Sequence, residues 1–479
     1  MSSQADNKRW WALTVIALAQ FMIIMDTSII GVALPEIQAD LGFSAESLSW
    51  VFNAYVIALG GLLLLGGRLS DLLGAKRVFT AGWIVLAAGS LAAGLATSTG
   101  VEVGARAVQG VGAALIAPSA LTLLMMLFGN EPKELMKAFA VYGAAAPAGG
   151  TAGVFLGGVI TEWISWPWVF YVNIPTAAIV LAVTPALMPG AAARRGSIDV
   201  VGAVTATAGL ALTVLGIVRA PNEGWGSAST LLVIGGGLAL LAIFVALQAR
   251  LREPLMRLSI FKTPNLAAAN LAQLLLGAAW IPMWFFLNLY LQQVLGYGAF
   301  EGGAALLPLT VAIMVLMVFV APRVINRLGF KTPIVGGLLL LAAGMAALSL
   351  VRPDGNFAAD VLPASLIAAT GMALAFIPSL GTAISSAKPE EGGLASGIVN
   401  TSYQVGSALG LALMAALATS QGADRLGNVQ ALTDGYSAAF LGAAGIALVG
   451  ALVAAALLRV PRPPAAEQEE AEEQVAVAA

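Results

Sequence analysis

The sequence predicts an all-α integral membrane protein, and three observations support this fold class. The chain of 479 residues is 59% hydrophobic and only 10% charged, and its mean hydropathy is +0.90. Apolar runs of about 20 residues, the length that crosses a bilayer, alternate with short polar loops. These runs lack the alternating period of a β-barrel, and helices satisfy every backbone group within one segment, as lipid requires.

Taken in order along the chain, the apolar runs predict fourteen transmembrane helices. They lie at about residues 11–33, 47–66, 78–97, 102–127, 136–160, 168–188, 198–218, 229–249, 265–290, 303–322, 333–351, 361–386, 395–420 and 436–458. The first run follows Lys8 and Arg9 as in a secretory signal, but it is too long for one, so we expect a retained helix. An even number of spans places both termini on the same side of the membrane.

The basic residues indicate which side that is. All but four of the 23 Lys and Arg residues fall at the termini or in loops on one side. They are Lys8, Arg9, Arg68, Lys76, Arg77, Lys133, Lys137, Arg194, Arg195, Arg250, Arg252, Arg257, Lys262, Arg323, Arg327, Lys331, Lys388, Arg459 and Arg462. Basic residues favour cytoplasmic loops, so we expect both termini in the cytoplasm of a multi-pass cell-membrane protein, of the kind found in bacterial inner membranes.

An internal repeat predicts the domain organisation. GRLSDLLGAKR (67–77), between spans two and three, resembles PRVINRLGFKT (322–332), between spans ten and eleven. Equivalent loops eight spans apart suggest two six-helix halves with two helices inserted between them. The expected units are an N-terminal bundle (1–190), two inserted helices with a cytoplasmic linker (191–262), a C-terminal bundle (263–460) and a disordered acidic tail (461–479).

Two residue types are missing from the chain, and their absence limits its chemistry. There is no Cys and no His, which excludes disulfides, thiol chemistry and Cys- or His-ligated metals. Any proton handling must use carboxylates, with Tyr or Lys less suited to it. We expect no metal site, no organic cofactor and no enzymatic activity, because the spans hold no paired acidic motif.

Asp26 is the only acidic residue well inside a predicted span, and Arg106 is the basic residue that stands out in the same way. An Asp at the centre of a membrane helix costs about 2.5–3.5 kcal/mol on insertion scales. Intramembrane carboxylates line transport pathways, so we predict that Asp26 binds and releases a proton and that Arg106 faces it; a structural hydrogen bond or a static ion pair is the alternative. Glu162 and Asp199 lie at span ends, where a cap or an interfacial carboxylate is expected.

Several motifs, in the same order along the chain, resemble those of the major facilitator superfamily and its fourteen-helix drug:proton antiporters. They are MDTSIIGVALPEI in the first span, GRLSDLLGAKR in the second loop, RAVQGVGAA (106–114), GGTAGVFLGG (149–158), WPWVFYVNIP, EPLMRLSIF, YLQQVLGY and GLASGIVNTSYQVGSALG. The chain departs from the family pattern at Val154, where Pro is usual, at Pro167, in place of Arg, and at Tyr403, in place of a common Arg.

The resemblance implies roles for three groups of residues. Asp26 and Arg106 would couple transport to protons, which would be the coupling ion. The loop residues Gly67, Arg68, Asp71, Gly74, Lys76 and Arg77 would form a conformational latch that holds the inward-closed state. The small residues Gly149, Gly153, Gly157 and Gly158 would form a tight, dry helix contact that blocks proton leakage.

Polar and aromatic residues in the spans are candidates for a substrate cavity. They are Asn53, Tyr55, Gln109, Asn173, Gln273, Trp280, Trp284, Asn288, Asn400 and Gln404. Each could instead join helices or lie at the membrane interface. Together they indicate a large, mostly apolar cavity, which suits amphipathic and cationic organic molecules better than sugars.

The expected function is therefore proton-coupled export of drugs or antibiotics by alternating access. The expected partners are the lipid bilayer and small amphipathic substrates, with no nucleic acid, and we expect a monomer. Two alternatives remain open within transport: an importer, and an exporter of a specific metabolite or lipid. A membrane-embedded transferase and a receptor or scaffold are alternatives from other classes.

Overall fold

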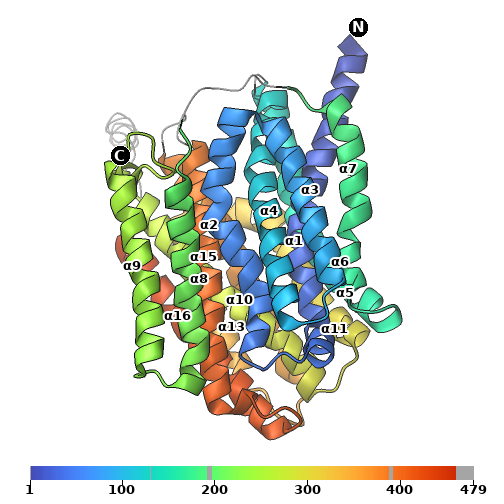
Figure 1. Cartoon of the computed structure of the whole chain (residues 1–479), viewed down its shortest axis with the longest axis vertical. Coiled ribbons are helices and arrows are strands. Elements are labelled where there is room, and N and C mark those ends of the chain that lie inside the picture. The colour runs from blue at the N-terminus through green and yellow to red at the C-terminus, as the bar shows by residue number, and fades with distance from the viewer. Residues whose placement is uncertain (1, 130, 191–196, 388–391, 460–479) are drawn as a thin grey trace, which may run out of the picture.

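The computed structural model describes residues 2–129, 131–190, 197–387 and 392–459, and this part of the chain contains helices and no strands (Figure 1). The helices are α1 (Ser2–Leu41), α2 (Trp50–Leu73), α3 (Ala75–Gly94), α4 (Thr99–Phe128), α5 (Pro132–Trp163), α6 (Trp168–Tyr171), α7 (Asn173–Leu187), α8 (Val200–Glu223), α9 (Ala228–Arg250), α10 (Leu266–Leu289), α11 (Ala299–Val315), α12 (Ala321–Leu328), α13 (Lys331–Leu348), α14 (Leu362–Ser386), α15 (Gly392–Ala418) and α16 (Val429–Leu457). Short helical segments adjoin several of these: η1 (Ser47–Ser49), η2 (Leu258–Lys262), η3 (Tyr290–Val294), η4 (Leu316–Val320), η5 (Phe357–Val361) and η7 (Thr419–Ala423).

The described residues contain 14 helices long and apolar enough to span a membrane, which confirms the predicted number. Some ends differ from the prediction: the fourth span begins at Thr99 rather than at residue 102. The predicted acidic tail (461–479) and the basic residues Arg194, Arg195, Lys388 and Arg462 lie outside the described residues.

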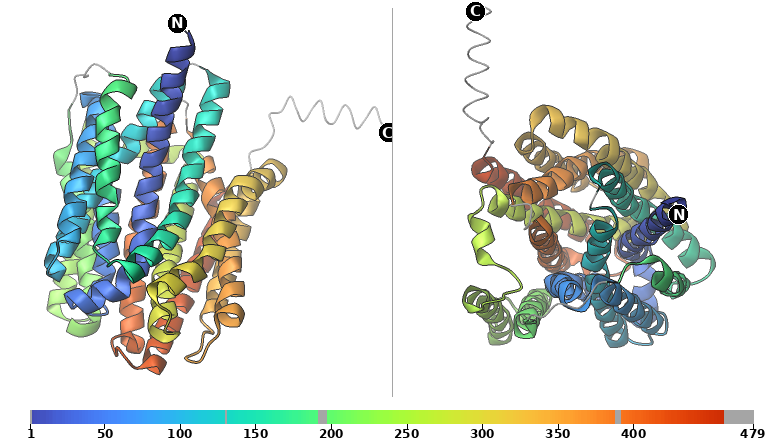
Figure 2. Two further views of the ribbon diagram at one scale, coloured as in Figure 1. Left: turned by 90° about the vertical axis from the view of Figure 1, so that its right-hand side faces the viewer. Right: turned by 90° about the horizontal axis from the view of Figure 1, so that it is seen from above.

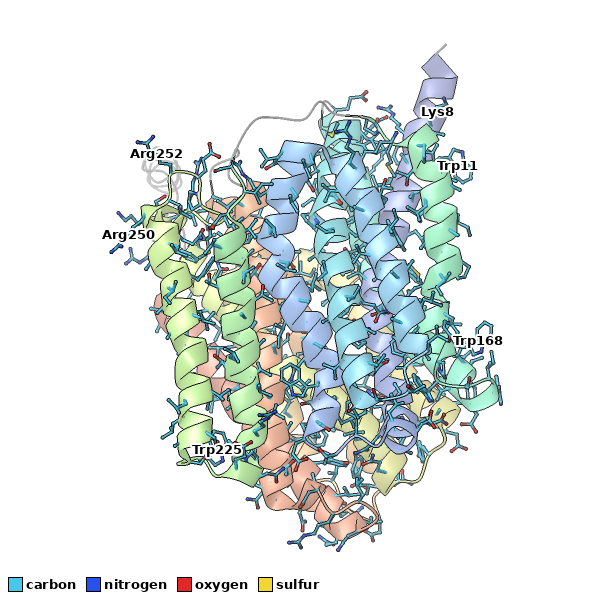
Figure 3. All side chains as sticks on the ribbon, in the orientation of Figure 1. Lys8, Trp11, Trp168, Trp225, Arg250 and Arg252 are labelled. Carbon is cyan, nitrogen blue, oxygen red and sulfur yellow. The ribbon has the colours of Figure 1, made fainter. Side chains whose placement is uncertain are left out.

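The spans run roughly side by side, so the molecule has two ends (Figure 1). We name the end where α1 begins and α16 ends the terminal face, and the other end the opposite face. Lys8, Arg250 and Arg252 lie at the terminal face in Figure 3. The exposed indoles of Trp168 and Trp225 lie toward the opposite face, so these rings are placed where interfacial aromatic residues gather in membrane proteins.

The helices pack in two groups with a pair between them. In the first group α1 packs on α5, and α4 packs on α2 and α3. In the second group α10 packs on α15 and α16, and α13 packs on α14 and α16. The pair α8 and α9 pack on each other, and α8 also contacts α2 and α15, so the pair lies along one side of the seam between the groups (Figures 1 and 2).

Helix ends at the linkers have side-chain caps. Asp199, expected at a span end, accepts a hydrogen bond from the backbone of Gly202 at 2.7 Å and one from Gln248 Nε2 at 2.6 Å. The first bond satisfies an amide that the helix itself leaves free. The second joins the start of α8 to the end of α9, which fixes the two inserted helices to each other.

The two groups of helices contact each other at the opposite face. Gln292 donates to the carbonyl of Val32 at 2.9 Å, and Gln293 donates to Gln38 at 2.8 Å. The rings of Trp163 and Phe300 stack with centroids 5.0 Å apart. The ribbons of α5 and α11 meet in this region and separate toward the terminal face (Figure 2), so this conformation is closed at the opposite face.

Candidate functional site

Asp26 lies in the middle of α1 and is 1% exposed. Its Oδ2 accepts a hydrogen bond from Arg106 Nη1 at 2.6 Å. Its Oδ1 accepts from Asn173 Nδ2 at 2.7 Å and from Gln109 Nε2 at 3.2 Å. Two of these donors come from α4 and the third from α7, so protein groups surround the carboxylate.

Arg106 is fully buried on α4 and has partners on three sides. Its Nε donates to the carbonyl of Val51 at 2.9 Å, and its Nη1 donates to Gln109 Oε1 at 2.7 Å as well as to Asp26. The guanidinium carbon lies 4.5 Å from the ring centroid of Tyr55, a cation–π distance. The charge of Asp26 is therefore paired inside the bundle, which offsets the cost of removing it from water.

Further hydrogen bonds, to Ser90, fix the amide side chains of Gln109 and Asn173. Ser90 Oγ on α3 accepts from Gln109 Nε2 at 2.8 Å and from Asn173 Nδ2 at 3.2 Å. Sequence reasoning assigned Gln109 and Asn173 to a substrate cavity, whereas the structure places both against Asp26. It did not identify Ser90, because a single Ser in an apolar helix gives no distinctive signal.

Glu102 is a buried carboxylate that sequence reasoning missed. It is 0% exposed, and neither of its oxygens has a hydrogen-bond partner among the described residues. Glu102 lies in the first turn of α4, which begins at Thr99, so it is buried near the end of a span, whereas Asp26 lies well inside one. The fourth span was predicted to begin at residue 102, which made Glu102 its first residue and gave no sign that the bundle encloses this side chain.

The glycines of α5 bring this helix into contact with α1 on both sides of Asp26. A Cβ added at Gly149 would lie 2.3 Å from the carbonyl oxygen of Phe21, one at Gly153 would lie 2.8 Å from that of Met25, and one at Gly157 would lie 2.8 Å from that of Ile29. Small residues at this spacing let two helices approach backbone to backbone.

Gly158, the last residue of this glycine series, faces a different helix. A Cβ there would lie 2.9 Å from the carbonyl oxygen of Ala299 and 2.9 Å from Phe300 Cα. Helix α5 therefore contacts the Asp26 helix along one stripe and the second helix group through Gly158, at the opposite face.

The predicted latch residues lie at the terminal face, where α2 ends and α3 begins. The two helices extend through the predicted loop, and only Gly74 lies between them. Arg68 Nη2 pairs with Glu253 at 2.6 Å, and Lys76 Nζ donates to the carbonyls of Pro185 and Met188 at 2.8 and 3.2 Å. Gly74 has a φ of 92°, which favours glycine at this turn. The other predicted latch residues are Gly67, which has only ordinary contacts, and Asp71 and Arg77, whose side chains are exposed.

Glu253 belongs to the linker that follows α9. Its carboxylate accepts from the backbone N and the hydroxyl of Ser197 at 2.8 and 2.9 Å. These hydrogen bonds, together with the guanidinium of Arg68, hold the pKa of Glu253 below its ordinary value. Both linkers of the inserted helices are thereby joined to the end of α2.

The other predicted cavity residues divide between two places. Trp284 and Asn288 on α10 lie against Gly31 of α1, and Gln404 on α15 lies against Gly60 of α2, so these three lie between the helix groups. Asn53 and Gln273 are buried, and their amide atoms have no hydrogen-bond partner among the described residues. The remaining members are Tyr55, beside Arg106, Trp280, which is buried on α10, and Asn400, which donates to Ser396.

Relatives of known name match nearly the full chain. A cephamycin export protein, CmcT, from Amycolatopsis lactamdurans is 39% identical over 94% of this chain and 93% of its own length. The puromycin resistance protein pur8 from Streptomyces alboniger is 36% identical, covering 95% of this chain and 92% of its own. A tetracenomycin C resistance and export protein from Streptomyces glaucescens is 32% identical over 88% of this chain and 78% of its own.

Solved transporter structures have the same fold. The peptide transporter POT in complex with sulfate aligns with a TM-score of 0.68 at 15% identity and covers 93% of this chain and 94% of its own. The nucleoside transporter NupG aligns with a TM-score of 0.66 at 16% identity and covers 94% of this chain and 99% of its own. The family model of the Major Facilitator Superfamily matches residues 16–411 and 388–479. With this match and full-length relatives above 30% identity, the chain belongs to the Major Facilitator Superfamily, a family of membrane transporters.

Proposed function

We propose that this protein exports hydrophobic or amphipathic organic compounds, such as antibiotics, in exchange for protons. The observation that carries the proposal is the buried pair of Asp26 and Arg106, which are joined at 2.6 Å in the centre of the first helix group. A carboxylate inside a membrane protein is costly and marks a transport or proton pathway. The names of the relatives, which include cephamycin, puromycin and tetracenomycin export or resistance, support the substrate class.

Protonation of Asp26 changes the forces at the site. The neutral acid no longer attracts the Arg106 guanidinium, so the bond at Oδ2 weakens and the guanidinium is free to move. The hydrogen bonds that Gln109 and Asn173 donate to the other oxygen weaken as well, since a neutral acceptor forms weaker bonds than an ionised one. A single proton therefore loosens α1 from α4 and α7 together.

Helix α5 connects this change to the contact between the helix groups. It touches the backbone of α1 at Gly149, Gly153 and Gly157, and it touches α11 at Gly158. A shift of α1 upon protonation of Asp26 would therefore displace α5, and with it the contact at Phe300. We infer that proton binding opens the opposite face by this route, and that the helix groups 1–190 and 263–460 move as two bundles.

The orientation of the chain identifies which face is external. The basic residues Lys8, Arg250 and Arg252 at the terminal face favour a cytoplasmic location for that face (Figure 3). The opposite face is then external, and this conformation is closed to the outside. We propose that substrate enters between the groups, beside Trp284, Asn288 and Gln404, and that the protein works as a monomer, with protons as its coupling ion and without enzymatic activity.

The latch would act in the other conformation. Asp71 is exposed here, while Arg68 and Lys76 bind groups of the linker and of α7. We propose that Asp71 gains a partner in the second helix group only when the terminal face closes, which would stabilise the inward-closed state.

Proton-driven uptake into proteoliposomes tests the proposal. Vesicles with an acidic lumen and a pH dye are mixed with labelled puromycin, and wild type is expected to accumulate it while the lumen becomes more alkaline. In Asp26→Asn we expect puromycin to bind without proton movement, because the site no longer ionises. Glu223→Gln, which changes an exposed carboxylate at the opposite face, serves as the matched control.

Three results would contradict the proposal in different ways. Normal exchange by Asp26→Asn would make Asp26 structural. Movement of protons in the same direction as puromycin would favour an importer. If neither puromycin, lincomycin nor a lipophilic cation such as tetraphenylphosphonium moves protons in wild type, drug antiport itself is wrong.

A further inference from the structure

Glu102 is the buried acid that the mechanism above does not use. It is fully buried, and no donor among the described residues reaches either oxygen. An isolated ionised carboxylate without hydrogen bonds is far more costly to bury than a neutral acid. Either Glu102 holds a proton here or a charge remains uncompensated.

Glu102 shares its surroundings with the charged pair of Asp26 and Arg106. Arg106 and Asp26 interact electrostatically with Glu102. Arg106 lies one helical turn away on α4, and Asp26 lies on α1 and binds Arg106. Two carboxylates and one guanidinium have a net charge of zero only when they share one proton, and the rings of Tyr55 and Phe170, which lie beside Arg106, add no charge at neutral pH.

Arg106 has a free donor that could reach a second carboxylate. Its Nη2 has no hydrogen-bond partner among the described residues, whereas its Nε and Nη1 are occupied. Side chains four residues apart on a helix lie on the same face and can pair. The unpaired donor of Arg106 and the unpaired acceptors of Glu102 therefore occupy neighbouring turns of α4.

The position of Glu102 along α4 indicates the path that a proton from the opposite face would take. Helix α4 begins at Thr99 at the opposite face and runs inward, so Glu102 comes before Arg106 on the way from that face. We propose that Glu102 holds a proton in this conformation and passes it to Asp26, which makes it the acid through which protons from the opposite face reach the coupling site. This inference rests on the proposed proton-coupled function.

The transfer balances in charge and in atoms. Before it, Glu102 is a neutral acid and Asp26 is a carboxylate paired with Arg106. The O–H bond of Glu102 breaks and one forms on Asp26; Glu102 is left as a carboxylate, and the guanidinium of Arg106 exchanges Asp26 for Glu102. The cluster is neutral in both states, so the proton moves without creating a buried net charge.

Infrared difference spectroscopy of the purified protein tests the protonation state without transport. At neutral pH, wild type minus Glu102→Gln is expected to show the C=O band of a protonated carboxylic acid, and wild type minus Glu223→Gln none. In Asp26→Asn the band is expected to disappear, because Glu102 then ionises to pair with Arg106. If Glu102 had only a packing role in α4, its C=O band would not depend on Asp26.

Proton-driven uptake tests the relay itself. We expect Glu102→Gln to bind puromycin like wild type and to lose proton-coupled uptake by more than about tenfold, in the range of a missing proton-transfer group. If the band is absent, or if it is present while Glu102→Gln couples normally, the inference is wrong. A third outcome separates the two proposals: wild type moves no protons, yet the band is present in wild type and absent in Asp26→Asn. In that case the proposed antiport and the relay are wrong, and Glu102 only shares a proton with Asp26.

Discussion

Asp26 is tolerated inside the membrane because several residues share its charge. Arg106 pairs with one oxygen, and two amides donate to the other. The same partners would make the site responsive, since each of them binds the ionised form more strongly than the neutral form.

The energetics of this pair can be measured by removing its members one at a time. Arg106→Met leaves the Asp26 carboxylate without its cation, and we expect a loss of about 3–5 kcal/mol in the free energy of unfolding. Adding Asp26→Leu to this variant should recover most of the loss, because both charges are then gone and Glu102 can remain neutral. Thermal unfolding in detergent measures the stability of the single and the double variant. Equal stability of the two would contradict this account.

At the scale of elements, α5 contacts α1 and α11 through the same series of glycines. The contacts to α1 lie beside the turns that flank Asp26, and the contact to α11 lies at Gly158. Backbone contacts of this kind leave no space for a side chain, so the two helices move together or separate as units.

Gly158→Ala is expected to open the opposite face. The added methyl group would lie 2.9 Å from the carbonyl oxygen of Ala299, and overpacking of this kind costs about 1–3 kcal/mol, here only in the closed conformation. Because the chain has no Cys, spin labels on Ile164→Cys and Val311→Cys report only on the distance between the end of α5 and a position inside α11. We expect a larger long-distance population in Gly158→Ala than in wild type.

Gly150→Ala is the matched control for this experiment. Its added methyl group would meet only Ser28 Oγ at 3.7 Å and Ile24 at 3.8 Å, which are ordinary contacts. Both variants gain the same helix propensity. A shift of equal size in the two variants would mean that propensity, rather than the contact with α11, causes the change.

At the scale of the whole molecule, the two inserted helices are joined to the first helix group by their linkers. Glu253 accepts from Ser197, before α8, and from Arg68, near the end of α2. The loop that resembles the family latch is thus attached to the inserted pair in this conformation, so the pair can influence when the loop is released.

This attachment should depend on pH. The folded-state pKa of Glu253 lies below its ordinary value, so the interaction is complete above the ordinary carboxyl value of about 4.3 and is lost as the pH falls through the folded pKa. Spin labels on Leu73→Cys and Leu251→Cys should show a broader distance distribution in that acidic range. Glu253→Gln should show the broad distribution at neutral pH, and a narrow one would contradict the role of the carboxylate.

The sequence by itself determined the number of spans, the clustering of basic loops on one side, and the two intramembrane charges, Asp26 and Arg106. These features are local: hydropathy and charge are read along a single segment, and lipid requires each segment to satisfy its own backbone. The tertiary structure decided which side chains meet. It placed Gln109 and Asn173 on Asp26 and enclosed Glu102, because the rotation of each helix is set by backbone contacts such as those of Gly149 and Gly153 with α1, which no single segment encodes.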